Sequence, residues 1–195
     1  MPIKDNREYR SMMEFRAAAD EEYIVEGYAS TFDPYLMYSW EGIDYFEEID
    51  RKAFDDADMS DVIMQYDHTG RVFARTSNGT LTLSIDDHGL KIRADLSKSE
   101  LARGLYNDIK EGLITKMSFA FTVEEDSYNR DTHTRGIKKI NKVYDVSAVS
   151  FPANGGTDIK ARSFFDGVIE EEKAERLERE QREKQKQRIR ILAGL

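Results

Sequence analysis

The sequence predicts an α+β, mainly β protein that ends in a charged helix. Three observations support this prediction: many short runs of β-favouring residues, one amphipathic helix near the middle, and a long charged C-terminal segment. Short strands with few helices favour a small β-barrel or a β-sandwich flanked by helices. With 195 residues, of which 39% are hydrophobic, the chain can also build a substantial core.

The first 20 residues are polar and lack periodicity, so they predict a flexible N-terminal arm. A polar loop is expected over 33–40, and a short helix over 51–57, with Asp50 as its cap and Phe54 facing inward. A hairpin turn is expected at 86–89, where Gly89 supplies a positive φ. Alternating or apolar β-type runs predict strands at 23–32, 44–49, 62–66, 71–76, 80–85 and 90–96.

The clearest helix is expected over residues 98–111. Ser97 and Glu100 have capping-box spacing, Leu101, Leu105 and Ile109 recur on one face, and a glycine follows. Strands at 114–123 and 137–151 come next, separated by a polar segment that predicts an exposed loop.

The composition changes after residue 165, which divides the chain into an arm (1–20), a domain (21–165) and a tail (166–195). The tail is rich in helix formers and carries an acidic first half and a basic second half, the sense that suits the helix dipole. Its apolar positions are too sparse for a self-sufficient coiled coil. We expect an exposed helix, with an interaction or processing tail as the alternative.

Several functional classes are disfavoured by composition. The absence of cysteine excludes a disulfide framework, a thiolate zinc site and a cysteine nucleophile. The net charge of −9 argues against nucleic-acid binding, which needs a basic face. We find neither a signal peptide nor an apolar run approaching the roughly 20 residues of a membrane span, so we expect a cytoplasmic protein. No cofactor is predicted.

Acidic residues gather between positions 44 and 61. Such a region could hold a divalent cation, but it shows no fixed ligand spacing, and a solvated acidic surface is the alternative.

Three histidines limit the choice of a general base. His88 lies in a predicted turn and His133 in a predicted polar loop, and these structural roles explain both. His68 directly follows the apolar run VIMQY, at the end of a predicted strand, where catalytic groups are often held. Its position alone fits a histidine in a polar turn equally well.

Ser118 interrupts a buried-strand pattern, MSFAFTV, on a face of small and polar residues. A serine becomes a nucleophile when an imidazole removes its proton and an acid orients that imidazole, although a buried serine bonded to backbone is common. Asp145 is a lone carboxylate in a valine-rich strand, where it either pairs with a group such as His68 or points to solvent.

At these residues the sequence resembles the caudovirus prohead (procapsid maturation) serine protease family. The resemblance covers about residues 20–165, in the order typical of that family. The matching segments are EGYASTF at 26–32, EEIDRKAF at 47–54, the run ending in His68, GLKIRADL at 89–96, GLITKMSFAF at 112–121 and YDVSAVSFPAN at 144–154.

The resemblance implies that His68 is the general base, Ser118 the nucleophile and Asp145 the orienting acid. Glutamate or aspartate is usual at the third position. It also implies a fold similar to herpesvirus assembly proteases, a small β-barrel surrounded by helices. Members of the family act inside the assembling prohead, in the host cytoplasm. They cut the scaffold or the N-terminal scaffolding segment of the major capsid protein, and often themselves.

Some expectations stay open at this stage. Backbone amides near Asn154, Gly155 and Gly156 are possible oxyanion-hole donors, because glycine permits close approach. A homodimer is possible. A non-catalytic scaffold or capsid-assembly factor with the same fold is the alternative function, and a metal-dependent hydrolase using residues 44–61 is a more distant one.

Overall fold

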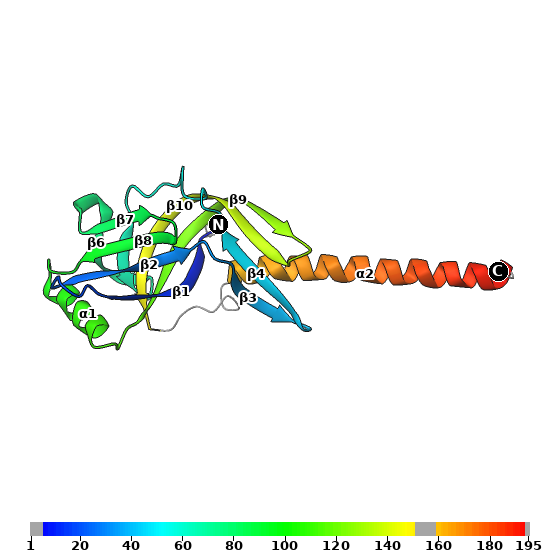
Figure 1. Ribbon diagram of the computed structural model, residues 1–195, viewed down its shortest axis with the longest axis horizontal. Coiled ribbons are helices and arrows are strands. Elements are labelled where there is room, and N and C mark those ends of the chain that lie inside the picture. The colour runs from blue at the N-terminus through cyan, green and yellow to red at the C-terminus, as the bar shows by residue number, and fades with distance from the viewer. Residues whose placement is uncertain (1–5, 151–158, 194–195) are drawn as a thin grey trace.

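A computed structural model describes residues 6–150 and 159–193 of the chain, and these residues are mainly β (Figure 1). The elements are β1 (Glu8–Ala17), β2 (Ile24–Thr31), β3 (Tyr35–Trp40), β4 (Ile43–Ile49), β5 (Ile63–Tyr66), β6 (Thr69–Arg75), a 3₁₀ turn (Thr76–Asn78), β7 (Leu81–Ile85), β8 (Gly89–Asp95), α1 (Glu100–Lys110), β9 (Lys116–Asn129), β10 (Thr134–Val149) and α2 (Ile159–Ala193).

All the described strands belong to one curved sheet, in the order β3-β4-β10-β9-β1-β2-β8-β7. Strand β10 is central to the sheet. Along one edge it pairs antiparallel with β9, and along the other it pairs parallel with β4 and then with β5. Strand β6 pairs with β5. Since β3 and β7 do not pair with each other, the sheet of the described residues does not close. The described strands thus form no closed barrel, and the predicted small β-barrel is not confirmed, whereas the mainly β class and the C-terminal helix are confirmed.

The main core lies between the curved sheet and α1. Four residues of α1, namely Ala102, Leu105, Tyr106 and Ile109, are buried in it. Leu101, which was expected on the same face, is 52% exposed. The helix also begins later than predicted, because the N-cap is Ser99, whose Oγ accepts a hydrogen bond from the Ala102 N–H.

Residues 8–17 were predicted to be part of a flexible arm, and this prediction is wrong. They form β1, which lies inside the sheet between β9 and β2. The polar character that suggested an arm has another cause: Glu8 and Arg10 are buried and pair with other charged side chains. A strand whose polar groups are paired internally does not show the apolar alternation on which the sequence argument relies.

Four local predictions also differ from the structure. Residues 35–40, expected to be a loop, form β3. Residues 51–56 form consecutive turns where a helix was expected over 51–57, although Phe54 is buried as expected. The polar segment 124–136 largely continues β9 and begins β10. Gly89 does not have a positive φ; glycine is needed there because a Cβ would lie 2.0 Å from the Ser30 carbonyl oxygen.

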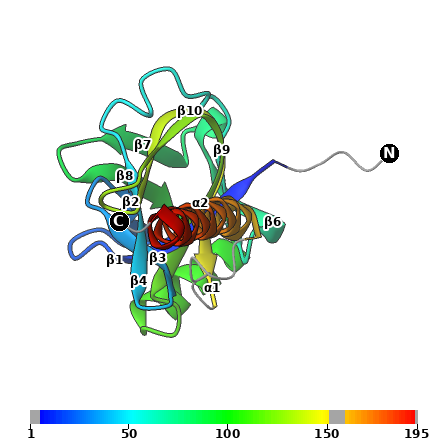
Figure 2. The same cartoon turned by 90° about the vertical axis from the view of Figure 1, so that its right-hand side faces the viewer.

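Helix α2 packs onto the β3–β4 hairpin with its first turns and then projects away from the sheet (Figure 1). A second buried cluster, separate from the main core, consists of Met37, Tyr45, Phe165 and Ile169. The remainder of α2 is exposed, and Figure 2 views it nearly end-on in front of the sheet. The start of the predicted tail is thus packed against the domain, and only its later part is exposed.

Candidate functional site

His68 lies in the two-residue turn between β5 and β6. Strand pairing continues to Tyr66 and Thr69, so Asp67 and His68 form the turn. Both have positive φ, 49° and 56°, as a type I′ hairpin turn requires. The Asp67 carboxylate accepts hydrogen bonds from the backbone N–H and the hydroxyl of Ser150, each at 2.8 Å. These hydrogen bonds thus hold the turn that carries His68 against the end of β10.

Asp145 reaches the same place because β10 is bulged. Val143 pairs with Phe121, but Asp145 pairs with Ala120, so Tyr144 is an extra residue in β10. Without the bulge, residues 143 and 145 would point to the same face. The bulge moves Asp145 from the face of Phe121 to the face of Ala120, and therefore away from the apolar core.

His68 and Asp145 are hydrogen-bonded to each other. The His68 Nδ1 lies 2.6 Å from the Asp145 Oδ1, with side chains that are 18% and 5% exposed. An ionised carboxylate only accepts hydrogen bonds, so Nδ1 carries the proton and Nε2 of a neutral imidazole is left as the basic nitrogen. This arrangement orients an imidazole for proton transfer.

Ser118 lies on the same face of the sheet. Its cross-strand partner in β10 is Ser147, two residues from Asp145, and directly opposed residues share a face. Ser118 is fully buried, and its Oγ is a buried side-chain polar atom without a hydrogen-bond partner within the described part of the chain. The structure thus brings the three predicted residues to one face, but Ser118 and His68 are not hydrogen-bonded.

Tyr9 adds a residue that the sequence argument missed. It pairs with Ala120 across β1 and β9, so it shares the face of Ser118. Its ring meets the His68 ring edge-to-face, with centroids 4.7 Å apart. Because residues 1–20 were predicted to be an arm, no sequence signal connected Tyr9 with His68.

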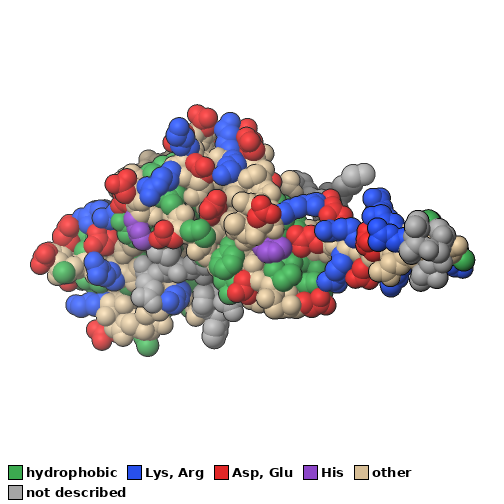
Figure 3. Space-filling model, turned by 45° about the vertical axis from the view of Figure 1, so that its right-hand side comes forward, with side chains coloured by type: hydrophobic (Ala, Val, Ile, Leu, Met, Phe, Trp, Pro, Cys, Tyr) green, Lys and Arg blue, Asp and Glu red, His purple; other side chains and the backbone are tan. Residues whose placement is uncertain are grey.

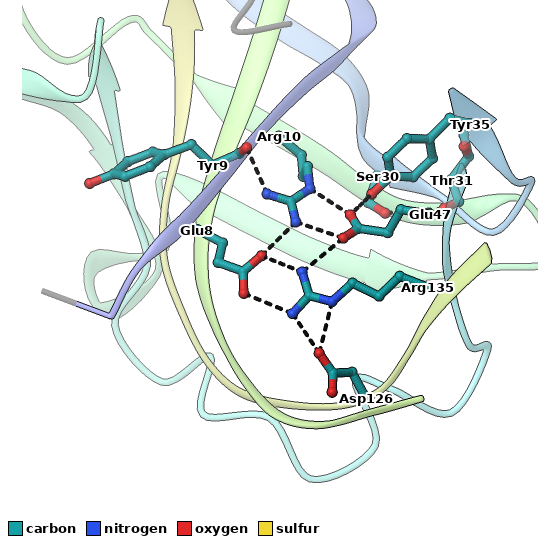
Figure 4. A network of polar contacts seen from close by, with 9 residues as sticks. All are labelled: Glu8, Tyr9, Arg10, Ser30, Thr31, Tyr35, Glu47, Asp126 and Arg135. Atoms are coloured by element: carbon teal, nitrogen blue, oxygen red, sulfur yellow. Dashed lines mark hydrogen bonds and ion pairs between the residues drawn. The ribbon is translucent and has the colours of Figure 1, made fainter. Parts of the chain in front are cut away.

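The neighbours of Tyr9 in β1 point to the opposite face and enter a buried ionic network (Figure 4). Arg10 bonds both carboxylate oxygens of Glu47, at 2.5 and 2.7 Å. Arg135 bonds Glu8 at 2.8 and 3.0 Å, and Glu47 at 3.0 Å. Burial lowers the pKa of Arg10, but the Glu47 carboxylate outweighs it and raises that pKa well above the ordinary value. The network joins β1, β4 and β10 on the face of the sheet opposite to the candidate site.

The other two histidines lie elsewhere. His88 packs edge-on against Tyr28, and His133 lies in the β9–β10 turn, 3.1 Å from the Tyr128 hydroxyl. A cavity of about 520 Å³ between α2 and the β3–β4 hairpin includes His133 and Glu172, but neither His68 nor Ser118 lines it.

No metal centre emerges from the described residues. Within 6–150 and 159–193, no three His, Asp or Glu side chains are arranged to hold a metal ion. On the face drawn in Figure 3, acidic and basic side chains are interspersed. No helix in these ranges is both long and apolar enough to cross a membrane. The possible oxyanion-hole residues, 154–156, lie outside the described residues.

Known protein sequences match parts of this chain. No solved structure matches it, so the herpesvirus-protease-like fold stays a prediction. The prohead protease of Enterobacteria phage HK97 is 31% identical over 88 residues, which are 45% of this chain and only 39% of that protein. The sequence profile of the caudovirus prohead serine proteases matches residues 11–170, most of the chain. The chain therefore belongs to the caudovirus prohead serine protease family.

Proposed function

We propose that the protein is a serine endopeptidase of phage prohead maturation, with Ser118 as nucleophile, His68 as general base and Asp145 as the acid that orients His68. The observation that carries the proposal is the His68–Asp145 hydrogen bond of 2.6 Å on the face that Ser118 shares. Membership of the prohead protease family supports the same chemistry.

In the proposed reaction, the Ser118 Oγ attacks the scissile carbonyl carbon while the His68 Nε2 takes its proton. His68 then gives that proton to the leaving amine, and a water molecule, activated by the same imidazole, hydrolyses the acyl-enzyme. Asp145 keeps the Nδ1 proton directed to itself and stabilises the imidazolium. Since Ser118 is fully buried and not bonded to His68, the site must open for a peptide and the two side chains must approach each other.

We further propose the substrates: the scaffold protein or the N-terminal scaffolding segment of the major capsid protein, and the protease itself, cut inside the assembling prohead in the host cytoplasm. The related phage protein is described as a prohead protease, and that name supports a role in the prohead.

The test uses an organophosphonate probe of serine hydrolases and co-expression with the major capsid protein. We expect labelling at Ser118 and cleavage of the capsid protein, both abolished in Ser118→Ala. Ser84→Ala, which removes an exposed hydroxyl from β7, is the matched control and should behave as wild type. Cleavage by purified, folded Ser118→Ala would contradict the proposal.

The alternative, a non-catalytic assembly factor, predicts the opposite pattern. Neither serine variant would change particle assembly, the probe would not label the chain, and removal of the exposed part of α2 would impair assembly.

A further inference from the structure

Ser147 is a buried serine that the proposed triad does not use. It lies on β10 directly opposite Ser118 on β9, and its side chain is completely buried. Its Oγ donates a hydrogen bond to the Asp145 Oδ1 at 2.6 Å. Asp145 and Ser147 are two residues apart in a strand, so their side chains share one face.

The same carboxylate oxygen serves two donors. The Asp145 Oδ1 lies 2.6 Å from the His68 Nδ1 and 2.6 Å from the Ser147 Oγ. One donor comes from the β5–β6 turn and the other from β10 itself. Two short hydrogen bonds to one oxygen restrict rotation of the carboxyl group, and hence the direction in which it holds the imidazole.

The two opposed serines are not equivalent. Buried hydroxyl groups normally find a hydrogen-bond partner, and Ser118 and Ser147 are cross-strand neighbours that could bond each other. Instead, Ser147 donates to Asp145, while the Ser118 Oγ has no partner within the described residues. The hydroxyl of Ser118 is therefore the one left available to the imidazole.

We propose that Ser147 is a positioning residue of this site: it fixes the Asp145 carboxylate that orients His68, and its commitment to Asp145 leaves the Ser118 hydroxyl uncommitted. This inference rests on the proposed function. Asp145 and Ser147 are two residues apart in β10, and under this proposal that spacing places the Ser147 hydroxyl against the Asp145 carboxylate. A serine that only fills space in the strand would not have this role.

The first measurement compares Ser147→Ala, Ser147→Thr and Ser147→Cys in peptide cleavage, with rates normalised to the folded fraction. We expect Ser147→Ala to lower kcat by about 10–100-fold, as loss of an outer hydrogen-bond partner commonly does. KM should stay within about twofold, because the proposed role of Ser147 is confined to the chemical step. Threonine keeps the hydroxyl and should restore most of kcat, while cysteine, a weak donor of similar size, should give an intermediate value.

A double-mutant cycle with Asp145→Asn separates positioning from packing. If Ser147 acts through Asp145, Ser147→Ala should cause no further loss of kcat in the Asp145→Asn background. If the two substitutions instead lower kcat by factors that multiply in the double variant, Ser147 acts by another route and the inference is overturned. A folded Ser147→Ala enzyme with wild-type kcat would also overturn it, and so would a threonine variant no better than alanine.

Mapping of the phosphonate adduct keeps this inference distinguishable from the proposed function. An adduct on Ser147 that survives Ser118→Ala would make Ser147 the nucleophile and reject its positioning role. If Ser118→Ala cleaves normally, the proposed function itself fails. If Ser118→Ala is inactive but Ser147→Ala is fully active, the proposed function stands and only the role of Ser147 is rejected.

Discussion

At the scale of single residues, His68 occupies a backbone conformation that histidine adopts infrequently. Its φ of 56° follows a φ of 49° at Asp67, and a non-glycine residue in this region costs roughly 1 kcal/mol or more. Hydrogen bonds hold the turn: the Asp67 N–H donates to the Ala148 carbonyl at 2.9 Å, and Ser150 binds the Asp67 carboxylate. A strained but anchored turn can direct an imidazole more accurately than a free loop.

Asp145→Asn provides the prediction at this scale. An amide at position 145 can present an N–H to His68 and so favour the wrong tautomer of the imidazole. We expect kcat for peptide cleavage to fall by about 10³–10⁴-fold with little loss of fold, as in other serine proteases with this change. Steady-state kinetics and circular dichroism measure the two effects.

Asp87→Asn is the matched control, because Asp87 is fully exposed and distant in sequence from the site. It should cleave at the wild-type rate. A folded Asp145→Asn enzyme that retained more than about a tenth of the activity would show that Asp145 does not orient the general base.

At the scale of elements, α2 consists of two parts with different physical roles. Its first turns bury Phe165 and Ile169 against Met37 and Tyr45 of the β3–β4 hairpin. Its later turns hold i,i+3 and i,i+4 ion pairs that are largely exposed. Such exposed pairs contribute only about 0–1 kcal/mol each, and the same holds for the ion pair that joins Arg130 of the β9–β10 turn to Glu175 of α2. Packing at the start of α2 therefore contributes more to its attachment than charge does.

Ile169→Ala should therefore destabilise the domain. Ile169 is 4% exposed, and truncation of a buried isoleucine typically costs about 2–5 kcal/mol. Leu177→Ala, on the same helix but 57% exposed, should change the free energy of unfolding by less than about 0.5 kcal/mol. Urea unfolding followed by tryptophan fluorescence reports on this hairpin, because Trp40 lies in β3.

An equally large loss in Leu177→Ala would contradict this division of α2. It would indicate that the exposed part of the helix is packed against another molecule in solution, such as a second copy of the chain, and analytical ultracentrifugation of both variants would identify that case.

At the scale of the whole molecule, β1 connects the candidate site with the buried ionic network. Alternate residues of one strand face opposite ways: Tyr9 contacts the His68 ring, while on the other face Arg10 pairs with Glu8 and Glu47. The network thus fixes β1 from the face of the sheet opposite to the candidate site, and β1 in turn holds Tyr9 against the His68 imidazole. Buried ion pairs add little net stability over apolar packing, but breaking one is costly.

Glu8→Gln tests this network through its pH dependence. Burial raises the pKa of Glu8, but the hydrogen bond from Arg135 and the charges of Arg10 and Arg135 outweigh it and keep that pKa below the ordinary value of 4.5. A carboxylate with a lowered folded-state pKa stabilises the fold above its unfolded-state pKa, and this stabilisation disappears as pH falls through the folded-state pKa. We expect Glu8→Gln to cost about 1–3 kcal/mol at pH 7, and less at progressively lower pH below 4.5.

Urea unfolding at several pH values between 7 and 3 measures this difference. Glu124→Gln, which removes an exposed partner of Lys139, should cost under about 1 kcal/mol at every pH. A Glu8→Gln deficit that does not shrink with falling pH would show that Glu8 stabilises the fold by packing rather than by charge.

The sequence was a good guide where a local rule applied. Strand periodicity located β2 and β5 to β8 closely, and strand-end position singled out the histidine that bonds Asp145 in the structure. It failed where long-range pairing overrode local character, as in β1, whose buried Glu8 and Arg10 look like surface residues until Glu47 and Arg135 are placed beside them. It could not reveal the β10 bulge either, because a bulge is a relation between two strands.

Of the site with which this chain is proposed to cut peptides, the sequence alone determined the residue types, their order and the family to which they belong. The tertiary structure decided that His68 bonds Asp145, that the Ser118 hydroxyl has no hydrogen-bond partner among the described residues, and that Ser147, opposite Ser118, donates to Asp145. The physical reason is that each residue carries its own side-chain chemistry wherever it stands in the sequence. The distances between the side chains of the site depend instead on turn geometry and strand register, which relate segments as far apart as 77 residues.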